Sequence, residues 1–457
     1  MPAAAPAPLM PADLDPIAAE LLARIEARTA RAGVIGLGYV GLPLAMSLAT
    51  AGYRVTGFDI DPPKIDALHR GESYIDAVPS DLLARMVAED RFSASCDLTR
   101  LAECDVIAIC VPTPLDAHRE PDLRFVETTA HDIARTLRPG QMIVLESTTW
   151  PGTTDTVLRP ILETSGLVAG HDFFLGFSPE REDPGNRDFT TSAIPKVVAG
   201  DGPAAQALIA AFYAAAIARI VPVSTTATAE AVKITENVFR AVNIALVNEL
   251  KVVYEAMGID IWEVIEAAKT KPFGYMPFYP GPGLGGHCIP IDPFYLTWKS
   301  REYELPTRFI ELAGEINSAM PRHVVGRLAE ALDRKLGKAL SRSRVLILGL
   351  AYKKNVPDLR ESPSLKLMEL IEERGAEVIY HDPHLPEIPR TRAYGAFMGR
   401  ASEPLTAEVL AGVDAVLIAT DHDHVDYATV SKTVRLIIDT RNVMARQGLQ
   451  GHHIVKA

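Results

Sequence analysis

The segment GVIGLGYVG, residues 33–41, decides the fold expected of this chain. It runs from a short apolar strand pattern into G-x-G-x-x-G, and a helical pattern of apolar residues follows. The three glycines are Gly36, Gly38 and Gly41, with Tyr39 and Val40 between the last two. Glycines so placed allow a tight turn, close approach of the backbone to a pyrophosphate, and close packing of the helix on the strand. Alone this motif is weak evidence, so its surroundings must decide.

A second strand pattern and an acidic residue follow at the spacing that a dinucleotide site requires. Residues 53–58 form a strand pattern that ends at Asp59, roughly 20 residues beyond the first glycine. A carboxylate at this position binds the ribose hydroxyls of NAD and repels the 2′-phosphate of NADP. Lys64 is a nearby cation that weakens the repulsion. We therefore expect a dinucleotide-binding domain that prefers NAD, with both side chains beside the cofactor.

Two threonines follow later strand patterns of the same segment. Thr113 comes after residues 105–111, and Thr148 comes after residues 142–145. Ligands of open α/β sheets lie beyond the carboxyl ends of the strands, so both threonines are expected to touch the cofactor. The alternative is that they only cap the helices that follow them.

A long helical pattern occupies the middle of the chain. Residues 226–257 contain neither proline nor glycine, and their apolar residues recur at helical spacing until Gly258. Lys233 and Asn237 are four positions apart and therefore share one face of this helix. A lysine here can take part in hydroxyl oxidation, which needs a proton acceptor near the reacting carbon. The alternative is an ordinary solvated lysine, since burial of a lysine is costly.

A single cysteine lies in the glycine-rich segment GPGLGGHCIPIDP, residues 281–293. Gly281, Gly283 and Gly285 precede Cys288, and Asp292 follows it. Glycine lets backbone approach a ligand closely, and a thiol becomes a useful nucleophile as its thiolate. The segment therefore predicts a nucleophile on a substrate-binding loop, with a small buried apolar cysteine as the alternative.

The last segment repeats the pattern of the first. A strand pattern at residues 345–348 leads into a turn and a helix, and further strand patterns follow. Ala351 and Lys353 stand where further glycines would be expected, so this turn is not expected to bind a dinucleotide through its backbone. Lys353, Lys354 and Arg360 are candidates for binding phosphates, with a solvated basic turn as the alternative. We interpret His422-Asp423-His424 as an ordinary polar loop and expect no metal site.

Bulk properties restrict the class of partner. A length of 457 residues suggests roughly three domains, and 48% hydrophobic with 23% charged residues is typical of a globular protein. The formal net charge of −12 argues against nucleic acid or an anionic membrane as a partner. The chain shows no membrane-span pattern, no secretion signal and no regular cysteine spacing. We therefore expect a cytoplasmic protein.

Together the patterns predict an α/β fold with two doubly wound Rossmann-like domains joined by a central all-helical segment. A flexible N-terminal tail with one helix is expected at residues 1–30, and the NAD-binding domain at 31–224. The central domain is expected at 225–332 and the C-terminal domain at 333–457, with the charged stretch 333–338 as a linker.

Seven motifs, in order along the chain, resemble those of the nucleotide-sugar 6-dehydrogenases of the UDP-glucose/GDP-mannose dehydrogenase family. They are GLGYVG, VPTP, ESTTWPGTT, SPERxxPG, KxxxN, GPGLGGHCIPIDP and GLAYKKNVPDLRESPS. The resemblance covers nearly all of the chain beyond residue 30. It implies that the first domain binds NAD, that the third binds the UDP part of a UDP-sugar, and that the central helices join two subunits into a homodimer.

The resemblance also implies a four-electron oxidation at C6 of the sugar. Lys233 would assist proton removal, while Asn237 and Asp292 hold the reacting oxygen or a water. Cys288 would attack the aldehyde, and a second oxidation would give a thioester, whose hydrolysis Glu180 would assist. The motifs place substrate contacts at Glu180, Arg181, Lys233, Asn237, Gly281, Gly283, Gly285, Lys353 and Arg441, and a position near the cofactor at Arg360.

The residues around the cysteine indicate the branch of the family. Enzymes for UDP-glucose typically show Ser-Cys-Phe-Pro-Lys-Asp there and Arg-Ile-Gly upstream, whereas this chain has His-Cys-Ile-Pro-Ile-Asp and Pro-Phe-Gly. His287 and the Ser-Pro-Glu-Arg run resemble the N-acetylhexosamine branch. We therefore expect UDP-N-acetylglucosamine as substrate, followed by UDP-N-acetylmannosamine and UDP-glucose. A hydroxyacid dehydrogenase and a silent nucleotide-sugar sensor are the remaining alternatives.

Overall fold

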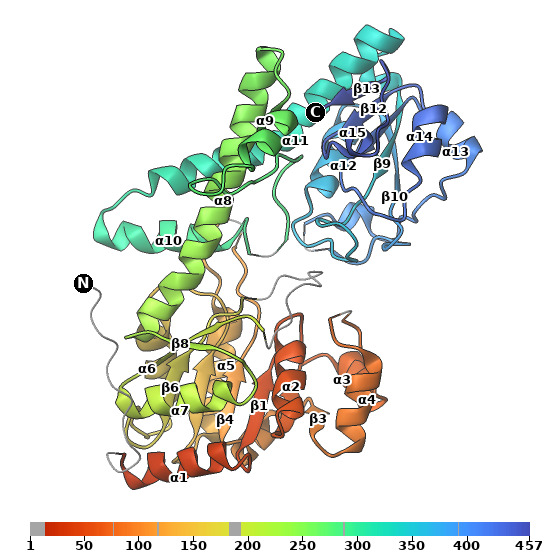
Figure 1. Ribbon diagram of the computed structural model, residues 1–457. Coiled ribbons are helices and arrows are strands. Elements are labelled where there is room, and N and C mark those ends of the chain that lie inside the picture. The colour runs from red at the N-terminus through yellow and green to blue at the C-terminus, as the bar shows by residue number, and fades with distance from the viewer. Residues whose placement is uncertain (1–13, 76, 117, 182–192, 287, 392) are drawn as a thin grey trace. The chain divides into compact units, whose positions relative to one another are not determined.

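The computed structural model describes residues 14–75, 77–116, 118–181, 193–286, 288–391 and 393–457 (Figure 1). The expected tail at residues 1–13 and the branch residue His287 lie outside these ranges. The chain divides into two compact units. The first holds residues 1–236 and 298–304, and the second holds residues 237–297 and 305–457.

An eight-stranded sheet forms the centre of the first unit, with the strand order β3-β2-β1-β4-β5-β6-β7-β8. Its strands are β1 (Arg31–Ile35), β2 (Arg54–Phe58), β3 (Phe92–Ser95), β4 (Val106–Ile109), β5 (Met142–Leu145), β6 (Phe174–Phe177), β7 (Lys196–Gly200) and β8 (Ile220–Pro222). All neighbours pair in parallel except β6 and β7. The strand order changes direction between β1 and β4, and the carboxyl ends of these strands mark the point where such sheets bind ligands.

Helices cover both faces of this sheet and close its core. They are α1 (Pro16–Glu26), α2 (Gly41–Thr50), α3 (Pro62–His69), α4 (Ser80–Ala88), α5 (Arg124–Thr136), α6 (Arg159–Glu163) and α7 (Pro203–Ala214), with short turns η2 (Leu98–Glu103), η3 (Thr154–Leu158) and η4 (Arg301–Tyr303). The residues of β4 and β5 are all buried, as expected for strands covered on both faces.

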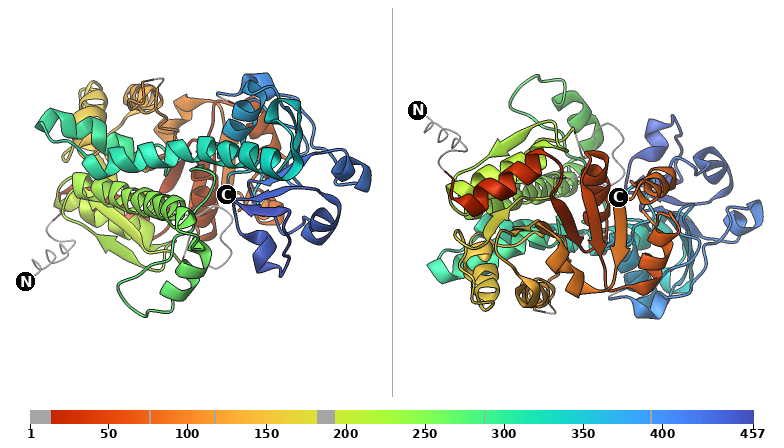
Figure 2. Two further views of the ribbon diagram at one scale, coloured as in Figure 1. Left: turned by 90° about the horizontal axis from the view of Figure 1, so that it is seen from above. Right: turned by 90° about the horizontal axis from the view of Figure 1, so that it is seen from below.

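The first helix is a packed part of the unit. It lies along α7 (Figure 2), and its buried side chains are Ala18, Leu21, Leu22 and Ile25. Asp15 caps its N-terminus by accepting from the amide of Ala18, and Arg24 binds the buried Asp105 at 2.5 Å. The apolar stripe at helical spacing therefore anchors residues 16–26, while residues 1–13 lie outside the described chain.

The second unit begins with most of α8 (Thr226–Ala256), which starts in the first unit. It continues with α9 (Ile261–Ala268), α10 (Asp292–Ser300) and α11 (Arg308–Leu336). α8 and α11 lie side by side (Figure 2), joined by a hydrogen bond between Asn248 and Asn317 of 2.9 Å and an ion pair between Glu255 and Arg327 of 2.5 Å. The cysteine loop contacts both of these long helices, and the C-terminal domain packs on α11 through α12.

A parallel five-stranded sheet completes the second unit, in the order β10-β9-β11-β12-β13. Its elements are η5 (Leu340–Arg342), β9 (Arg344–Leu348), α12 (Pro363–Glu373), β10 (Glu377–His381), η6 (Gly395–Phe397), α13 (Ala407–Ala411), β11 (Ala415–Ile418), α14 (Tyr427–Thr433), β12 (Ile437–Asp439), α15 (Val443–Arg446) and β13 (Ile454–Lys456). The expected fold class, two Rossmann-like sheets with a helical segment between them in sequence, is confirmed.

The charged stretch 333–338 is not the linker that its composition suggested. α11 continues through Leu336 and ends where Gly337 adopts the left-handed conformation, with φ of 59°. Arg334 and Lys335 lie in the last turn, where cations interact favourably with the helix dipole. No helix within the described ranges is long and apolar enough to cross a membrane.

Candidate active site

The turn after β1 has the geometry of a dinucleotide cradle. Gly36 has a φ of 90°, and a Cβ there would lie 2.6 Å from the carbonyl oxygen of Cys110. A Cβ on Gly41 would lie 1.9 Å from the carbonyl oxygen of Gly36, so α2 packs directly on the turn. A Cβ on Gly38 would meet no atom of the described residues within 4 Å. The first and third glycines are thus required by packing, whereas the second leaves open space of the kind that a pyrophosphate needs.

The acidic residue at the end of β2 is attached to this turn. Asp59 accepts the amide of Leu37 at 3.0 Å, and the Lys64 ammonium lies 3.4 Å from the same carboxylate oxygen. The Asp59 side chain keeps 9% of its surface exposed. Tyr74 closes the turn from outside by donating to the carbonyl of Leu37 at 2.7 Å. The carboxylate is held at the place where a ribose would lie, and the open cradle together with this acid fits NAD.

Both predicted threonines lie beyond the strands that precede them. Thr113 is buried beyond β4, and Thr148 is half-buried beyond β5. The N-cap positions of the following helical segments are occupied by Leu123 and Thr153, so the alternative that Thr113 and Thr148 cap these segments is wrong. Tyr39 and Val40 lie in the cradle turn itself, where Val40 precedes α2.

A buried ionic group below Thr148 was missed by the sequence interpretation. Glu146 binds the Lys196 ammonium at 2.9 Å and accepts the hydroxyl proton of Tyr213. Burial raises the pKa of Glu146, although the Lys196 charge opposes this effect. The group joins β5 to β7 and α7 and so supports the loop that carries Thr148. An isolated glutamate at a strand end gives no sequence signal for such partners.

The predicted catalytic lysine is buried near the start of α8. Lys233 donates to the backbone carbonyl of Glu180, which places two predicted catalytic residues in contact within the first unit. Arg181 donates to the carbonyl of Pro195 at 2.7 Å and to the Glu236 carboxylate at 2.6 Å. Its guanidinium is therefore already engaged with protein groups. The remainder of this motif, residues 182–185, falls in the range 182–192 that lies outside the described chain.

The aspartate of the glycine-rich segment contacts α8 in the second unit. Asn237 donates its amide proton to Asp292 at 2.6 Å, and both side chains are buried. The amide of Asp292 donates to the carbonyl of Cys288 at 2.8 Å, and the cysteine is half-buried. This turn joins the backbone of Cys288 to a buried amide and carboxylate pair, and a cysteine with such neighbours is suited to covalent attack on a carbonyl carbon whose oxygen is hydrogen-bonded.

The glycines of the loop are needed because other backbone and side chains crowd them. A Cβ on Gly281 would lie 2.8 Å from Nη1 of Arg441, and one on Gly285 would lie 2.5 Å from the Cβ of Tyr352. Gly283 has a φ of 142° and faces Pro321 and Pro363. The loop thus lies on α11 and on the C-terminal domain. Close packing explains these glycines without a ligand, so contact with substrate remains a prediction.

The basic residues after β9 have mixed surroundings. Arg360 forms a bidentate pair with Asp358, with an Nη2–Oδ2 distance of 2.6 Å, and Lys354 pairs with Asp423 at 2.6 Å. Lys353 is half-buried on the same turn. Arg441 is half-buried and donates from Nε to the carbonyl of Ala419 at 2.7 Å. Of these predicted side chains, Arg441 is the one whose position against the cysteine loop the structure defines.

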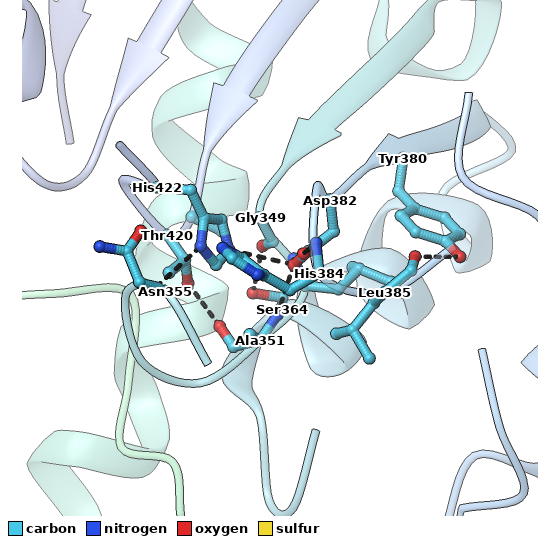
Figure 3. Close-up of polar contacts among 12 residues, drawn as sticks. Gly349, Ala351, Asn355, Ser364, Tyr380, Asp382, His384, Leu385, Thr420 and His422 are labelled. Carbon is cyan, nitrogen blue, oxygen red and sulfur yellow. Dashed lines mark hydrogen bonds and ion pairs between the residues drawn. The ribbon is translucent and has the colours of Figure 1, made fainter. Parts of the chain in front are cut away.

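The corresponding turn of the C-terminal domain is closed by a histidine (Figure 3). The amide of Asn355 donates to Nδ1 of His422, so the ring proton is on Nε2 and points at Asp382, 3.1 Å away. His422 is buried, and the interpretation of residues 422–424 as an ordinary polar loop is wrong for this residue. Within the described residues, no group of histidine, cysteine and acidic side chains could hold a metal ion.

Two further polar residues of α8 were missed, although the sequence carries a signal for them. Lys251 lies 18 residues after Lys233, which is five turns at about 3.6 residues per turn, and Asn248 follows Asn237 by three turns. All four side chains are buried. A buried polar stripe along one helix face can be recognised from spacing alone, once the face is known to be covered.

Comparison with known proteins assigns the three parts of the chain to domains of one protein family. Models of the UDP-glucose/GDP-mannose dehydrogenase family match the chain with the NAD binding domain at residues 30–217, the central domain at 227–319 and the UDP binding domain at 346–446. The UDP-N-acetyl-D-glucosamine 6-dehydrogenase of Pseudomonas aeruginosa is 36% identical over 395 residues, which are 86% of this chain and 90% of that protein.

A second relative was found by sequence and by structure. The UDP-N-acetyl-D-mannosamine dehydrogenase of Pyrococcus horikoshii is 34% identical over 420 residues, covering 91% of this chain and 96% of that protein. A solved structure of a UDP-D-ManNAc dehydrogenase from Pyrococcus horikoshii has a TM-score of 0.84 at 33% identity, covering 93% of this chain and 98% of the other. A UDP-glucose dehydrogenase from Pyrobaculum islandicum has a TM-score of 0.80 at 28% identity, covering 93% of this chain and 98% of the other.

Proposed function

This chain belongs to the UDP-glucose/GDP-mannose dehydrogenase family and is an NAD-dependent UDP-sugar dehydrogenase, and from that premise we propose that it oxidises UDP-N-acetylglucosamine. The product is the corresponding uronic acid, formed by two successive oxidations at C6. The observation that carries the proposal is the buried Asn237–Asp292 pair beside the turn of Cys288. A one-step alcohol dehydrogenase has no need of a nucleophile at this position.

Lys233 acts in the first oxidation. NAD, when bound at the cradle of Gly36 and Gly38, accepts one hydride in each oxidation. Lys233 assists removal of the proton from the C6 hydroxyl, and Asn237 with Asp292 orients the reacting oxygen or a water. The carbonyl of Glu180 positions the lysine ammonium, which also stabilises the negative oxygen of the tetrahedral intermediates.

Cys288 acts in the second oxidation. Its sulfur adds to the C6 aldehyde to give a thiohemiacetal, and loss of a second hydride gives a thioester. Water then cleaves the C–S bond, which releases the carboxylate and restores the thiol, and Glu180 assists this hydrolysis. The overall reaction consumes one alcohol, two NAD and one water, and it yields one carboxylate, two NADH and three protons.

The choice of UDP-N-acetylglucosamine rests on the branch residues and the relatives. Pro272-Phe273-Gly274 replaces the Arg-Ile-Gly run of the UDP-glucose enzymes, and the Phe273 side chain is exposed. The 36% identical relative is named for UDP-N-acetylglucosamine, whereas relatives at 34% and 33% are named for UDP-N-acetylmannosamine. UDP-N-acetylmannosamine, which differs from UDP-N-acetylglucosamine in the configuration at C2 of the sugar, is therefore the alternative substrate.

Homodimer formation through the central helices is part of the same proposal. Phe239, Leu246 and Val253 are exposed on α8 at a spacing of seven residues, so they form one apolar stripe. Exposed apolar stripes of this kind indicate a protein interface. Substitution of Leu246 by glutamate should convert a dimer to a monomer in sedimentation experiments. An unchanged mass would contradict dimer formation through this stripe.

A substrate panel tests the proposed reaction. The purified chain is mixed with UDP-N-acetylglucosamine, UDP-N-acetylmannosamine or UDP-glucose, and NADH formed per sugar consumed is measured. Two NADH with UDP-N-acetylglucosamine as the best substrate is expected. One NADH per sugar would identify a simple hydroxyacid-type dehydrogenase, and binding without NADH would identify a nucleotide-sugar sensor.

The covalent step is tested by Cys288→Ser, with Cys96→Ser as the control because Cys96 is an exposed free cysteine. The first variant should lose turnover by about 100-fold or more, since a serine hydroxyl is a much weaker nucleophile than a thiolate. The control should keep full activity. Full turnover by Cys288→Ser would contradict the thioester mechanism.

A further inference from the structure

The most unusual charged side chain outside the assigned residues is Lys251 on α8. It is 4% exposed, and its Nζ has no hydrogen-bond partner among the described residues. A buried ammonium without a partner is costly, because neither water nor a protein acceptor replaces its hydration. A binding site can keep such a destabilising ammonium, because a bound ligand supplies the hydrogen-bond acceptor that the protein lacks.

The charges around Lys251 leave it without compensation. Burial lowers the pKa of its ammonium to about 8, Glu255 opposes this effect, and Arg441 adds to it. The Glu255 carboxylate, one turn along α8, already binds Arg327 at 2.5 Å. Asp439 accepts the amides of Arg441 and Met444, both at 2.9 Å. The acids near Lys251 thus have other donors, and the local charge is positive.

Lys251 and Arg441 lie at the start of the cysteine loop. The amide of Gly281 donates to the side-chain oxygen of Asn248 at 3.0 Å, one turn before Lys251 on α8. The space that a Cβ on Gly281 would fill is bounded by Nη1 of Arg441 at 2.8 Å. Side chains of a helix tilt toward its N-terminus, so Lys251 covers the level of Asn248 and Gly281.

The loop contacts α8 at two levels that are separated by the length of a nucleotide sugar. Its reactive end contacts Asn237 through Asp292, and its first residue contacts Asn248. From Asn237 to Asn248 the helix rises about 16 Å at 1.5 Å per residue. A nucleoside diphosphate sugar with C6 at the reactive end extends over a distance of this order. Its nucleotide half then lies at the level of Lys251.

We propose that Lys251 is a further substrate-binding residue that, together with Arg441, receives the nucleotide half of the UDP-sugar. Its ammonium donates to an oxygen acceptor of that half, either a uracil carbonyl or a phosphate. The inference rests on the proposed function, because it takes C6 of the sugar to lie at Cys288. It also accounts for a buried lysine that the oxidation chemistry does not use.

Calorimetric titration with UDP tests the proposal, using the full chain without NAD so that turnover does not enter. Lys251→Met removes the charge at similar volume, and Lys432→Met, which removes the charge of an exposed lysine of α14, is the matched control. The dissociation constant for UDP should rise about tenfold or more in Lys251→Met and stay unchanged in the control. Lys251→Arg should restore part of the affinity if that variant folds.

Two further readouts separate binding from structure. In turnover with the UDP-sugar, Lys251→Met should raise KM with kcat nearly unchanged, because the contact is the same in ground and transition states. In thermal unfolding without ligand, Lys251→Met should have a higher melting midpoint than the native chain, and UDP should raise that midpoint less. A purely structural lysine would lower the midpoint on substitution.

Titration with uridine separates the two acceptors. Loss of uridine affinity together with UDP affinity identifies a uracil oxygen, and loss for UDP alone identifies the phosphate; either result supports the proposal. Equal UDP affinity of the native chain and Lys251→Met would overturn it and leave the proposed function standing. Failure of the native chain itself to bind UDP would overturn the proposed function as well.

Discussion

The two Rossmann-like domains begin with turns of the same shape. In the first unit β1 leads into Gly36 and β2 into Asp59, whereas in the second unit β9 leads into Gly349 and β10 into Asp382. The two glycines have φ values of 90° and 83°, and a Cβ on them would lie 2.6 Å and 2.4 Å from a backbone carbonyl oxygen. Each carboxylate accepts amide protons of its own turn.

The turns differ in the accessibility of the carboxylate. Asp59 remains partly exposed beside Lys64, whereas Asp382 is fully buried and bound by His422 (Figure 3). The open second glycine of the first turn, Gly38, is replaced by Ala351. We infer that the glycine turn alone does not make a dinucleotide site. An acid that still faces outward, and space for the pyrophosphate, are needed as well.

Removing each carboxylate should give the largest difference between the two turns. Asp382→Ala should lower the free energy of unfolding by about 3–5 kcal/mol, because it leaves a buried imidazole donor and two buried amides without an acceptor. Asp59→Ala should cost less than about 2 kcal/mol, because Lys64 can return to water. Urea unfolding followed by circular dichroism measures both. Equal decreases in the free energy of unfolding would show that Asp59 stabilises the fold as much as Asp382 does.

Changing the charge at the first turn should alter the cofactor preference. Asp59→Asn should raise kcat/KM for NADP relative to NAD by about tenfold or more, since the repulsion of the 2′-phosphate is removed while Lys64 remains. Asp61→Asn, which removes a charge two residues away, is the control and should have a smaller effect. An unchanged cofactor ratio in Asp59→Asn would contradict the assignment of Asp59 to the ribose.

Exchanging the residues at the second glycine position separates the effect of open space from the effect of an exposed acid. Gly38→Ala should change the free energy of unfolding by less than about 1 kcal/mol, because space is open there, but it should weaken NAD binding about tenfold. Ala351→Gly should cost about 1 kcal/mol and create no NAD binding in the second unit, because Asp382 stays covered. Titration of NAD, with the melting midpoint as control, distinguishes the two outcomes.

The acid dependence of stability should show the smallest difference. Burial would raise the pKa of Asp382, but the hydrogen bond from His422 and the bonds from backbone amides outweigh it and hold the pKa below its ordinary value. This carboxylate therefore stabilises the fold above about pH 4, and its contribution is lost as the pH falls through the lower pKa of the folded state. Asp382→Asn should show a shallower loss of unfolding free energy below about pH 4 than the native chain, as measured by urea unfolding across an acid series. Parallel curves for the two proteins would contradict the role given to this carboxylate.

The regular features of the fold were predictable because they follow from local pattern. The glycine spacing from Gly36 to Gly41, Asp59 at the end of the next strand, and the apolar strands all lie where the sequence placed them. The end of α11 was misplaced, because residues 333–338 were taken as a linker although Arg334 and Lys335 suit the last turn of a helix.

Side-chain partners were less predictable, because they join residues far apart in the sequence. Glu146 finds Lys196 and Tyr213, and His422 finds Asp382, through contacts that only the folded sheets create. Arg181 was expected to bind substrate, yet its guanidinium contacts Glu236 and the carbonyl of Pro195. Such contacts carry no periodicity that a sequence could reveal.

The family, the two Rossmann-like folds and the candidate chemistry of Cys288, Lys233, Asn237 and Asp292 could be predicted from the amino-acid sequence. Those features depend on the type and spacing of residues within single segments. The folded structure was needed to see which of the two glycine turns keeps an accessible acid, and that Lys251 lies buried near Arg441. Burial and electrostatic surroundings depend on which distant segments cover a side chain, and that information arises when the chain is folded.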